Sequence, residues 1–380
     1  MSASITQQIN YKIELLCYGV KPNSVVEQIY AKQNPYDQKR TGNIGIQVLL
    51  GNEKLPTNIP VRHRFTYASP YELVGVSDQF FIQKVGSENQ LPIFVIDTPE
   101  WYMESVGLEK HAGDYLLQEG TSTLIASITD SCIYANSNRP CAFCGIGKDC
   151  NVHAYSDERE QQIFKSLDFA FANGIERYGS VNLTGGNSDN PHYRGIENYI
   201  PFIRYIRNKG DIPICLEVSP PQELEILKQC VDIGVNAFMM NIEIWDENLR
   251  NLFMPMKASI KREEYLKACK EAVKLVGKGN VSSVIIVGLE NETSATEAIN
   301  ELVDIGVIPS IMPLRPNDAT VLENFPTTQP NLVSSLTKKV ARLLYNSGFN
   351  MDRLPGCIGC GACAAERDEF SHILKEEIAK

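Results

Sequence analysis

Two short cysteine triplets constrain this chain more than any other feature of its sequence. They are Cys132, Cys141, Cys144, Cys357, Cys360 and Cys363. Cysteine thiolates are the usual protein ligands of iron–sulfur clusters. A cubane cluster has four irons, so three thiolates hold it and leave one iron open to another ligand. The two triplets therefore predict two [4Fe–4S] clusters, one in each half of the chain.

Zinc and disulfides are the two alternatives for these cysteines. A structural zinc site needs a fourth Cys or His at short spacing, and Cys150 and His153 are the nearby candidates. The N-terminus lacks a basic segment joined to an apolar one, so no secretory signal is predicted and we expect the reducing cytoplasm. The cysteines outside the triplets stand singly in apolar surroundings typical of buried thiols, namely Cys17, Cys215, Cys230 and Cys269.

Composition narrows the class of partner. The chain carries a net charge of −10 and has no dense Lys/Arg run. Because phosphate binding needs a basic face, we expect no nucleic-acid partner. No apolar stretch approaches the length that spans a bilayer, so we expect a soluble protein that does not enter the membrane.

The residue pattern divides the chain into three parts. Residues 1–120 form a β-rich N-terminal region, with β-like runs such as 46–50 and 80–83. Residues 121–325 alternate apolar strands with amphipathic helical patterns, and residues 326–380 form a C-terminal helix and a tail with the second triplet. The predicted strands are 124–129, 180–183, 212–218, 237–242, 282–287 and 309–313.

This alternation predicts an α/β fold: a full or partial (β/α) barrel of about six βα units, with right-handed crossovers. Barrels of this kind place their chemistry at the C-terminal ends of the strands. The first triplet follows directly after the first predicted strand. It is therefore where a barrel would hold a reactive cofactor.

With this triplet after the first barrel strand, residues 121–320 resemble the radical S-adenosylmethionine (SAM) superfamily. The resemblance implies that Cys132, Cys141 and Cys144 hold a [4Fe–4S] cluster whose open iron binds the amino and carboxylate groups of SAM. An electron from reduced flavodoxin or ferredoxin then cleaves SAM to a 5′-deoxyadenosyl radical. The cofactor supplies the difficult chemistry, and the protein supplies its position.

Further residues match the superfamily by position, and their roles are implied by the resemblance. Phe143 is similar to the aromatic that precedes the last ligand, and Gly288 opens a turn similar to the one beside the adenine. A glycine-rich turn that meets the methionyl amino group is matched by Thr184, Gly185 and Gly186. Charged groups that face the cofactor are matched by Glu217, Glu243 and Arg262. Ordinary surface or ion-paired roles explain each of these three charged residues equally well.

One departure concerns the spacing of the first triplet. Eight residues separate Cys132 from Cys141, where the superfamily commonly has three. This long loop, together with the terminal Cys-x-x-Cys-Gly-Ala-Cys, resembles a branch found near nitrilase genes. The barrel is also similar to that of biotin synthase. That enzyme's sacrificial-cluster cysteines are not reproduced here, and only Cys215 is near a comparable strand.

The second triplet predicts an auxiliary cluster at Cys357, Cys360 and Cys363. We expect the tail to fold over the barrel mouth and present an open iron to the substrate. If that iron carries sulfide, the enzyme inserts sulfur into an unactivated C–H bond, as biotin and lipoyl synthases do, using a small molecule or a lipoyl-carrier protein as substrate. Alternatively, the cluster binds substrate or relays electrons while a small amine or amino acid is oxidised or rearranged. A non-catalytic metal-binding scaffold is the third possibility.

Overall fold

The computed structural model describes residues 3–34, 45–76, 79–137, 139–146, 155–318 and 320–380. The chain begins with two helices, α1 (Ile5–Tyr18) and α2 (Ser24–Gln33). Ser4 and Gln7 form a reciprocal capping box that satisfies backbone donors at the start of α1. These two helices were not predicted from the sequence.

An antiparallel five-stranded sheet follows the two helices. Its strands are β1 (Gly45–Leu50), β2 (Leu55–Pro60), β3 (Tyr71–Val76), β4 (Gln79–Lys84) and β5 (Gln90–Val95), in the order β2-β1-β5-β4-β3. The predicted runs 46–50 and 80–83 are confirmed as β1 and β4. A short hairpin of β6 (Ser105–Gly107) and β7 (Lys110–His111) completes the N-terminal region.

The second sheet has seven strands and confirms the predicted α/β class. They are β8 (Leu116–Glu119), β9 (Thr123–Thr129), β10 (Ser180–Gly185), β11 (Ile214–Glu217), β12 (Ala237–Met239), β13 (Val281–Val287) and β14 (Ile308–Pro313). The order runs from β14 to β8 in sequence, with β9 to β14 parallel and β8 antiparallel to β9. Since β8 and β14 are the two edges, the sheet is an open, partial barrel.

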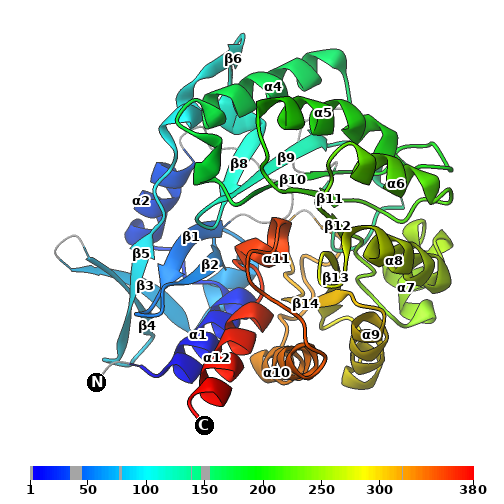
Figure 1. The fold of residues 1–380 in the computed structure, drawn as a ribbon. Coiled ribbons are helices and arrows are strands. Elements are labelled where there is room, and N and C mark those ends of the chain that lie inside the picture. The colour runs from blue at the N-terminus through cyan, green and yellow to red at the C-terminus, as the bar shows by residue number, and fades with distance from the viewer. Residues whose placement is uncertain (1–2, 35–44, 77–78, 138, 147–154, 319) are drawn as a thin grey trace.

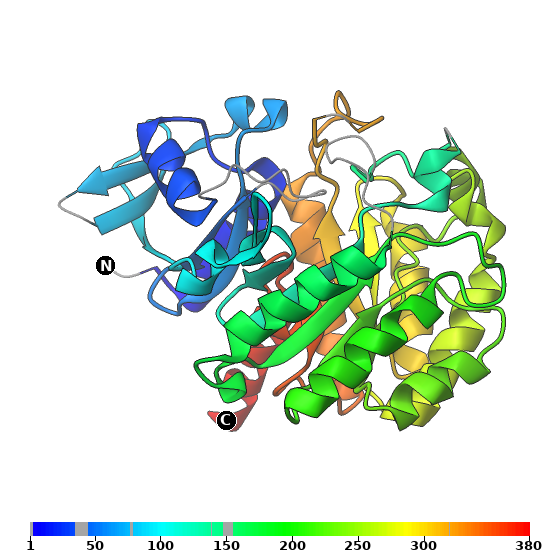
Figure 2. The same cartoon turned by 90° about the horizontal axis from the view of Figure 1, so that it is seen from above.

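Helices cover the outer face of this curved sheet (Figure 2). They are α4 (Asp157–Phe171), α5 (Ile200–Lys209), α6 (Glu225–Asp232), α7 (Glu247–Phe253), α8 (Arg262–Val276) and α9 (Glu292–Asp304). Val181 and Leu183 of β10 belong to the same buried apolar core as Phe202 and Ile203 of α5. Because side chains alternate along a strand, Asn182 then faces the inside of the sheet. The concave face is therefore partly polar, whereas the outer face is apolar.

The tail has three helices, α10 (Pro330–Asn346), α11 (Gly356–Cys360) and α12 (Glu366–Ile378). Both α1 and α10 pack against α12, while α11 contacts β9, β10 and β11. In Figure 1, α11 lies at the centre of the molecule, between the two sheets. The tail therefore occupies the open side of the partial barrel.

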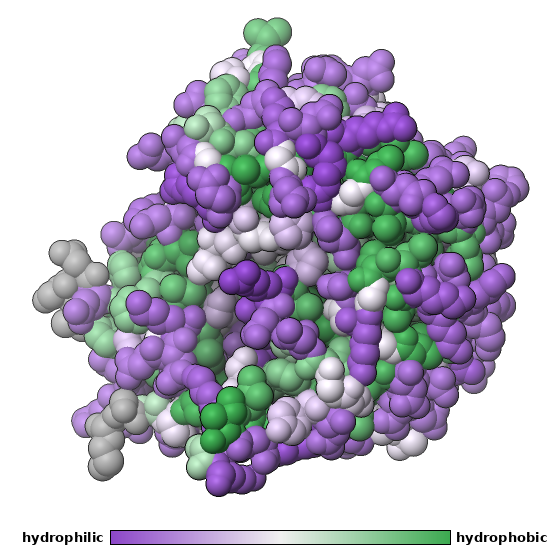
Figure 3. Space-filling view, in the orientation of Figure 1, coloured by the Kyte–Doolittle hydropathy of each residue, from purple (hydrophilic) through white to green (hydrophobic). Residues whose placement is uncertain are grey.

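The face shown in Figure 3 is largely covered by hydrophilic side chains. Among the described residues, no helix is both long and apolar enough to cross a bilayer.

Candidate functional site

The first triplet is in the loop that follows β9. Cys132 is the residue before the short helix α3 (Ile133–Asn136). The backbone on both sides of Ala142 fixes the second half of the loop, because the Ala142 amide donates to the Phe253 carbonyl at 2.7 Å and the Ala142 carbonyl accepts from Leu322 at 3.2 Å. Phe143 packs on the apolar cluster that contains Ala142. Phe143 thus anchors the loop.

The three thiols of this loop influence one another electrostatically. Burial and the neighbouring Cys132 together raise the pKa of Cys144 to about 11. The pKa of Cys141 is also raised by burial, and then by Glu243, Cys144 and Cys132. Three thiolates that lie close together need positive charge nearby, which iron supplies on coordination. The donor set therefore fits an iron–sulfur cluster.

Within the described ranges, no three His, Cys, Asp or Glu side chains converge on a point that would suit a single metal ion. An iron–sulfur cluster does not require its ligands to converge on one point, because each thiolate binds its own iron. Cys150 and His153, the candidate fourth ligands for zinc, lie outside the described residues.

The glycine-rich turn after β10 lies directly against the first ligand. A Cβ on Gly186 would lie 2.1 Å from the Ser131 carbonyl oxygen and 2.6 Å from the Cys132 Cβ, so no side chain fits there. The Ile133 amide donates to the Asn187 carbonyl at 2.9 Å. The turn after β10 thus packs on the cluster loop, and its contact with SAM stays a prediction.

Glu243 lies next to the same loop in a backbone conformation that is rare for glutamate. Its φ is +67°, and it is held there by hydrogen bonds of its amide and carbonyl to Val284 and Ile286. Such strain costs about 1–3 kcal/mol and tends to occur at functional sites. Its carboxylate lies 2.8 Å from the ammonium group of Lys257.

Lys257 is a site residue for which the sequence offered no signal. Burial alone would lower its pKa, but Glu243, Tyr265 and Cys141 together outweigh burial and raise the pKa well above its ordinary value. Lys257 also lowers the pKa of Cys141 and of Tyr134 in the cluster loop. It therefore places a positive charge beside the first triplet.

The other two predicted cofactor contacts have defined surroundings. Arg262 begins α8, and its guanidinium lies 4.6 Å from the ring centroid of Trp245. Gly288 has a φ of +112°, and a Cβ there would lie 2.5 Å from the Thr328 hydroxyl oxygen. Thr328 donates to the Val287 carbonyl at 2.8 Å and ties this turn to the end of β13. Their roles toward SAM stay predictions.

The segment that carries the second triplet contacts the second sheet at the end where its parallel strands begin. The amide of Gly356 donates to the Ser180 hydroxyl at 3.0 Å, and Ser180 is the first residue of β10. Cys132, by contrast, follows the C-terminal end of β9. Figure 2 shows the red tail and the loop after β9 at opposite ends of the strands. The expectation that the tail covers the mouth beside the first triplet was wrong, because α11 packs inside the sheet where the strands begin.

Each thiol of the second triplet has different neighbours. Cys357 Sγ accepts a hydrogen bond from Asn182 Nδ2 at 3.5 Å. A side-chain hydrogen bond from Arg315 lowers the pKa of Cys363 against the larger opposing effect of burial. Cys360 Sγ lies 2.9 Å from the position that a Cβ on Gly120 would take.

The three thiols of the second triplet are partly buried and interact with one another. Burial raises the pKa of Cys357, and the charges of Glu217, Cys360 and Cys363 also raise it. As at the first triplet, three mutually interacting thiols fit a cluster held by three thiolates. Of the two acidic residues near the second triplet in sequence, Glu366 is buried at 3% exposure and accepts a hydrogen bond from Ser310 at 2.9 Å, whereas Asp352 is exposed.

Cys215 differs from the other single cysteines. Cys17, Cys230 and Cys269 lie in the main apolar core, as predicted. Cys215 of β11 is buried too, but it packs in a small cluster against Cys357. A Cβ on Gly356 would lie only 2.7 Å from its Sγ. The fold thus brings a fourth thiol to the second triplet.

Polar side chains link the two ends of the concave face. Asn182 donates to Glu217 at 3.4 Å, and Asn241 Nδ2 donates to the other Glu217 oxygen at 2.8 Å. Lys257 then donates to the Asn241 carbonyl at 3.4 Å and to Glu243. Glu217 therefore lies between the two triplets on the concave face of the sheet.

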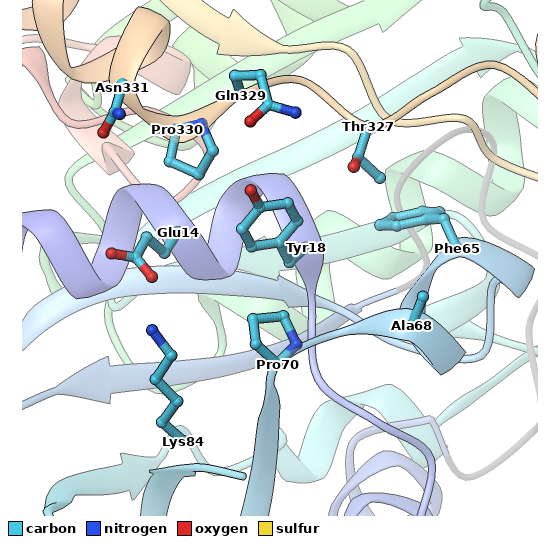
Figure 4. Close-up of a pocket in the computed structure, with 10 residues that line it drawn as sticks. All are labelled: Glu14, Tyr18, Phe65, Ala68, Pro70, Lys84, Thr327, Gln329, Pro330 and Asn331. Carbon is cyan, nitrogen blue, oxygen red and sulfur yellow. The ribbon is translucent and has the colours of Figure 1, made fainter. Parts of the chain in front are cut away.

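A separate pocket lies between α1 and the start of α10 (Figure 4). Its lining includes Glu14, Tyr18, Lys84 and Gln329. No cysteine of either triplet lines this pocket.

One family model matches part of this chain. Residues 128–303 match the model of the radical SAM superfamily. Bacteriochlorophyllide c C-7(1)-hydroxylase of Chlorobaculum limnaeum is 22% identical over 249 residues, which are 60% of this chain and 62% of that protein. The chain thus spans less than two thirds of that relative.

Two solved structures align with part of this chain. Methylornithine synthase (PylB) aligns with a TM-score of 0.48 and 17% identity, covering 66% of this chain and 70% of that one. HydG, a maturase of the [FeFe]-hydrogenase, aligns with a TM-score of 0.46 and 14% identity, covering 60% and 49%.

Proposed function

We propose that this chain, whose residues 128–303 match the radical SAM superfamily model, functionalises an unactivated C–H bond with the help of a second iron–sulfur cluster in its tail. When bound, the first cluster and SAM supply a 5′-deoxyadenosyl radical. Cys132, Cys141 and Cys144 would hold that cluster. The Gly186 turn, Glu243 and Arg262 are the proposed contacts to SAM, and reduced flavodoxin or ferredoxin is the proposed electron donor.

The observation that carries this proposal is the polar connection between the two triplets. Asn182, Glu217 and Asn241 form a hydrogen-bonded series on the concave face, with Cys357 at one end and Lys257 beside Cys141 at the other. Buried polar groups are costly unless they are hydrogen-bonded, and Asn182 Oδ1 has no partner among the described residues, so a hydrogen-bond donor of a ligand would satisfy it. A substrate held along this face would lie between the two clusters.

Sulfur insertion is the first candidate outcome. It needs an iron of the tail cluster that no protein thiolate occupies, so that the iron can carry sulfide toward the substrate. The position of Cys357 on the concave face supports it, because a cluster there would face the same space as the first triplet. Under this candidate, the substrate is a small molecule or a lipoyl-carrier protein.

Cys215 favours a second candidate. A fourth thiolate would complete the tail cluster, and a closed cluster suits electron relay rather than sulfur delivery. The reaction would then be an oxidation or rearrangement, with a small amine or amino acid as substrate. The hydroxylase relative is an oxidising enzyme by name, and Glu217 supplies an acceptor for a substrate ammonium group.

One experiment separates the two candidates. Iron and acid-labile sulfide are measured on anaerobically reconstituted protein for the wild type, Cys215→Ala and the control Cys230→Ala. Sulfur insertion predicts that Cys215→Ala keeps about eight irons per chain and still forms product. Electron relay predicts that Cys215→Ala alone changes the electron paramagnetic resonance (EPR) spectrum of the tail cluster. Protein that contains zinc and does not cleave SAM would instead support the scaffold alternative.

A further inference from the structure

Lys12 on α1 is fully buried beneath the second triplet. Its side chain has 0% exposure, and its ammonium group donates to the Gly361 carbonyl at 2.7 Å and to Asp368 at 2.5 Å. Gly361 is the residue directly after Cys360. Burying an ammonium group is costly, so its persistence here requires compensating negative charge.

Both hydrogen bonds of the Lys12 ammonium group go to the tail. Asp368, its ion-pair partner, comes from the same tail. The opening helix therefore contributes a cation to a site whose ligands are more than three hundred residues away in sequence.

A second contact comes from the five-stranded sheet. The Asn58 amide of β2 donates to the Ala362 carbonyl at 2.8 Å. Gly361 and Ala362 are the two residues between Cys360 and Cys363, and both of their carbonyls are thus bound by residues of the N-terminal region. This fixes the backbone that joins the last two thiols.

A third contact comes from the turn before β9. Gly120 has a φ of +56°, and a Cβ there would lie 2.9 Å from Cys360 Sγ. The Gly120 amide donates to Gln47 Oε1 of β1 at 2.6 Å. The hydrogen bond to Gln47 thus holds the turn against the Cys360 thiol, and there is no room for a side chain at Gly120.

We propose that residues 1–120 form one wall of the tail iron–sulfur site, with Lys12 as the buried cation that tunes the potential of the cluster. This rests on the proposed second cluster. Adding an electron to a cluster is favoured by a nearby positive charge, and net charge and hydrogen bonds to the cluster set its reduction potential. Lys12 and Gly120 are positioning residues, because they act through the tail and touch no substrate.

The contact between the N-terminal region and the tail site is tested by comparing Gly120→Ala with the control Gly86→Ala. Both glycines have positive φ, but a Cβ on Gly86 meets nothing within 4 Å, so this control reproduces the backbone strain without the contact. We expect Gly120→Ala to lose about half of the iron, the tail's share, and Gly86→Ala to keep it all. Full iron and an unchanged tail-cluster EPR signal in Gly120→Ala would overturn the wall.

The electrostatic role is tested by EPR-monitored redox titration of Lys12→Met and Asp368→Asn. Removing the cation should move the tail midpoint potential to more negative values, whereas removing the anion should move it to more positive values. The first cluster should keep its potential in both. Shifts of the same sign, or no shift, would show that the Lys12–Asp368 pair is structural only.

The triple variant Cys357→Ala/Cys360→Ala/Cys363→Ala separates this inference from its premise. If wild type and triple variant bind equal iron, the second cluster itself is absent and the proposed function fails. If the triple variant loses about half of the iron while Gly120→Ala does not, the cluster stands and only the wall fails.

Discussion

Asn182 of β10 donates a hydrogen bond to Cys357 of the tail across 3.5 Å, and the same amide group donates to Glu217. This contact joins a barrel strand to a segment that the chain reaches only near its end. Asn182 is fully buried, and its Oδ1 has no partner among the described residues. An acceptor left open at this point is consistent with a substrate or ligand donor in the concave face.

Asn182→Ala should therefore lower product formation without preventing cleavage of SAM. The side chain contacts the tail triplet and Glu217, and not the cluster loop. Liquid chromatography of product and 5′-deoxyadenosine measures both yields, with the exposed Asn251→Ala as control. Equal loss of both yields would assign Asn182 to SAM binding instead.

The two triplets should have separable roles. Cys141→Ala should abolish SAM cleavage, because the first cluster loses a ligand. Cys360→Ala should keep uncoupled cleavage and form no product. The yields of product and of 5′-deoxyadenosine test this prediction. If Cys360→Ala still forms product, the tail cluster has only a structural or accessory redox role.

Gly186→Ala should lose the first cluster. Its Cβ would overlap the Ser131 carbonyl at 2.1 Å and displace Cys132. Gly75→Ala is the matched control, since its nearest contact would be an ordinary 3.6 Å from Phe80 and neither glycine has a positive φ. Iron content should fall by about half in Gly186→Ala alone. Retained iron with weaker SAM binding would place the turn's role in SAM binding only.

The Lys257–Glu243 pair should show strong coupling in stability. Their side chains are 12% and 14% exposed, so either single change, Lys257→Met or Glu243→Gln, leaves a poorly solvated charge and should cost about 3–5 kcal/mol. The double variant should recover much of this loss. Urea unfolding of the four proteins gives the coupling energy, and additive losses would mean that the pair is effectively solvated.

Glu366 should make stability depend on pH. Burial raises its pKa from 4.5 to about 7. Below a pH of about 4.5 the Glu366 carboxyl is protonated in both the folded and the unfolded state, so it does not change the free energy of unfolding. Between about 4.5 and about 7 only the unfolded state ionises, so stability falls as pH rises through this window and is constant above it. Glu366→Gln should flatten that slope in urea midpoints, whereas the exposed Glu247→Gln should not.

Local signals predicted the strands of the second sheet and selected the candidate cysteine ligands. Runs of apolar residues such as 282–287 predicted the strands of the partial barrel, and Cys132 and Gly186 were each placed after the end of a strand. These inferences work because the carboxyl ends of adjacent parallel strands lie at one edge of a sheet. The helices α1 and α2 were missed, because weak amphipathic patterns beside β-like runs do not separate helix from strand.

The sequence by itself determined the two cysteine triplets, the alternation of strands and helices, and the resemblance to radical SAM enzymes. Only the tertiary structure decided that the tail enters at the far end of the sheet, that Cys215 joins the second triplet, and that Lys257, Lys12 and Gly120 belong to the sites. The physical reason is that ligand type and hydrophobic period are local properties of a chain. Which distant side chains share a buried space depends on how whole elements pack, and that is set by contacts spread over the entire fold.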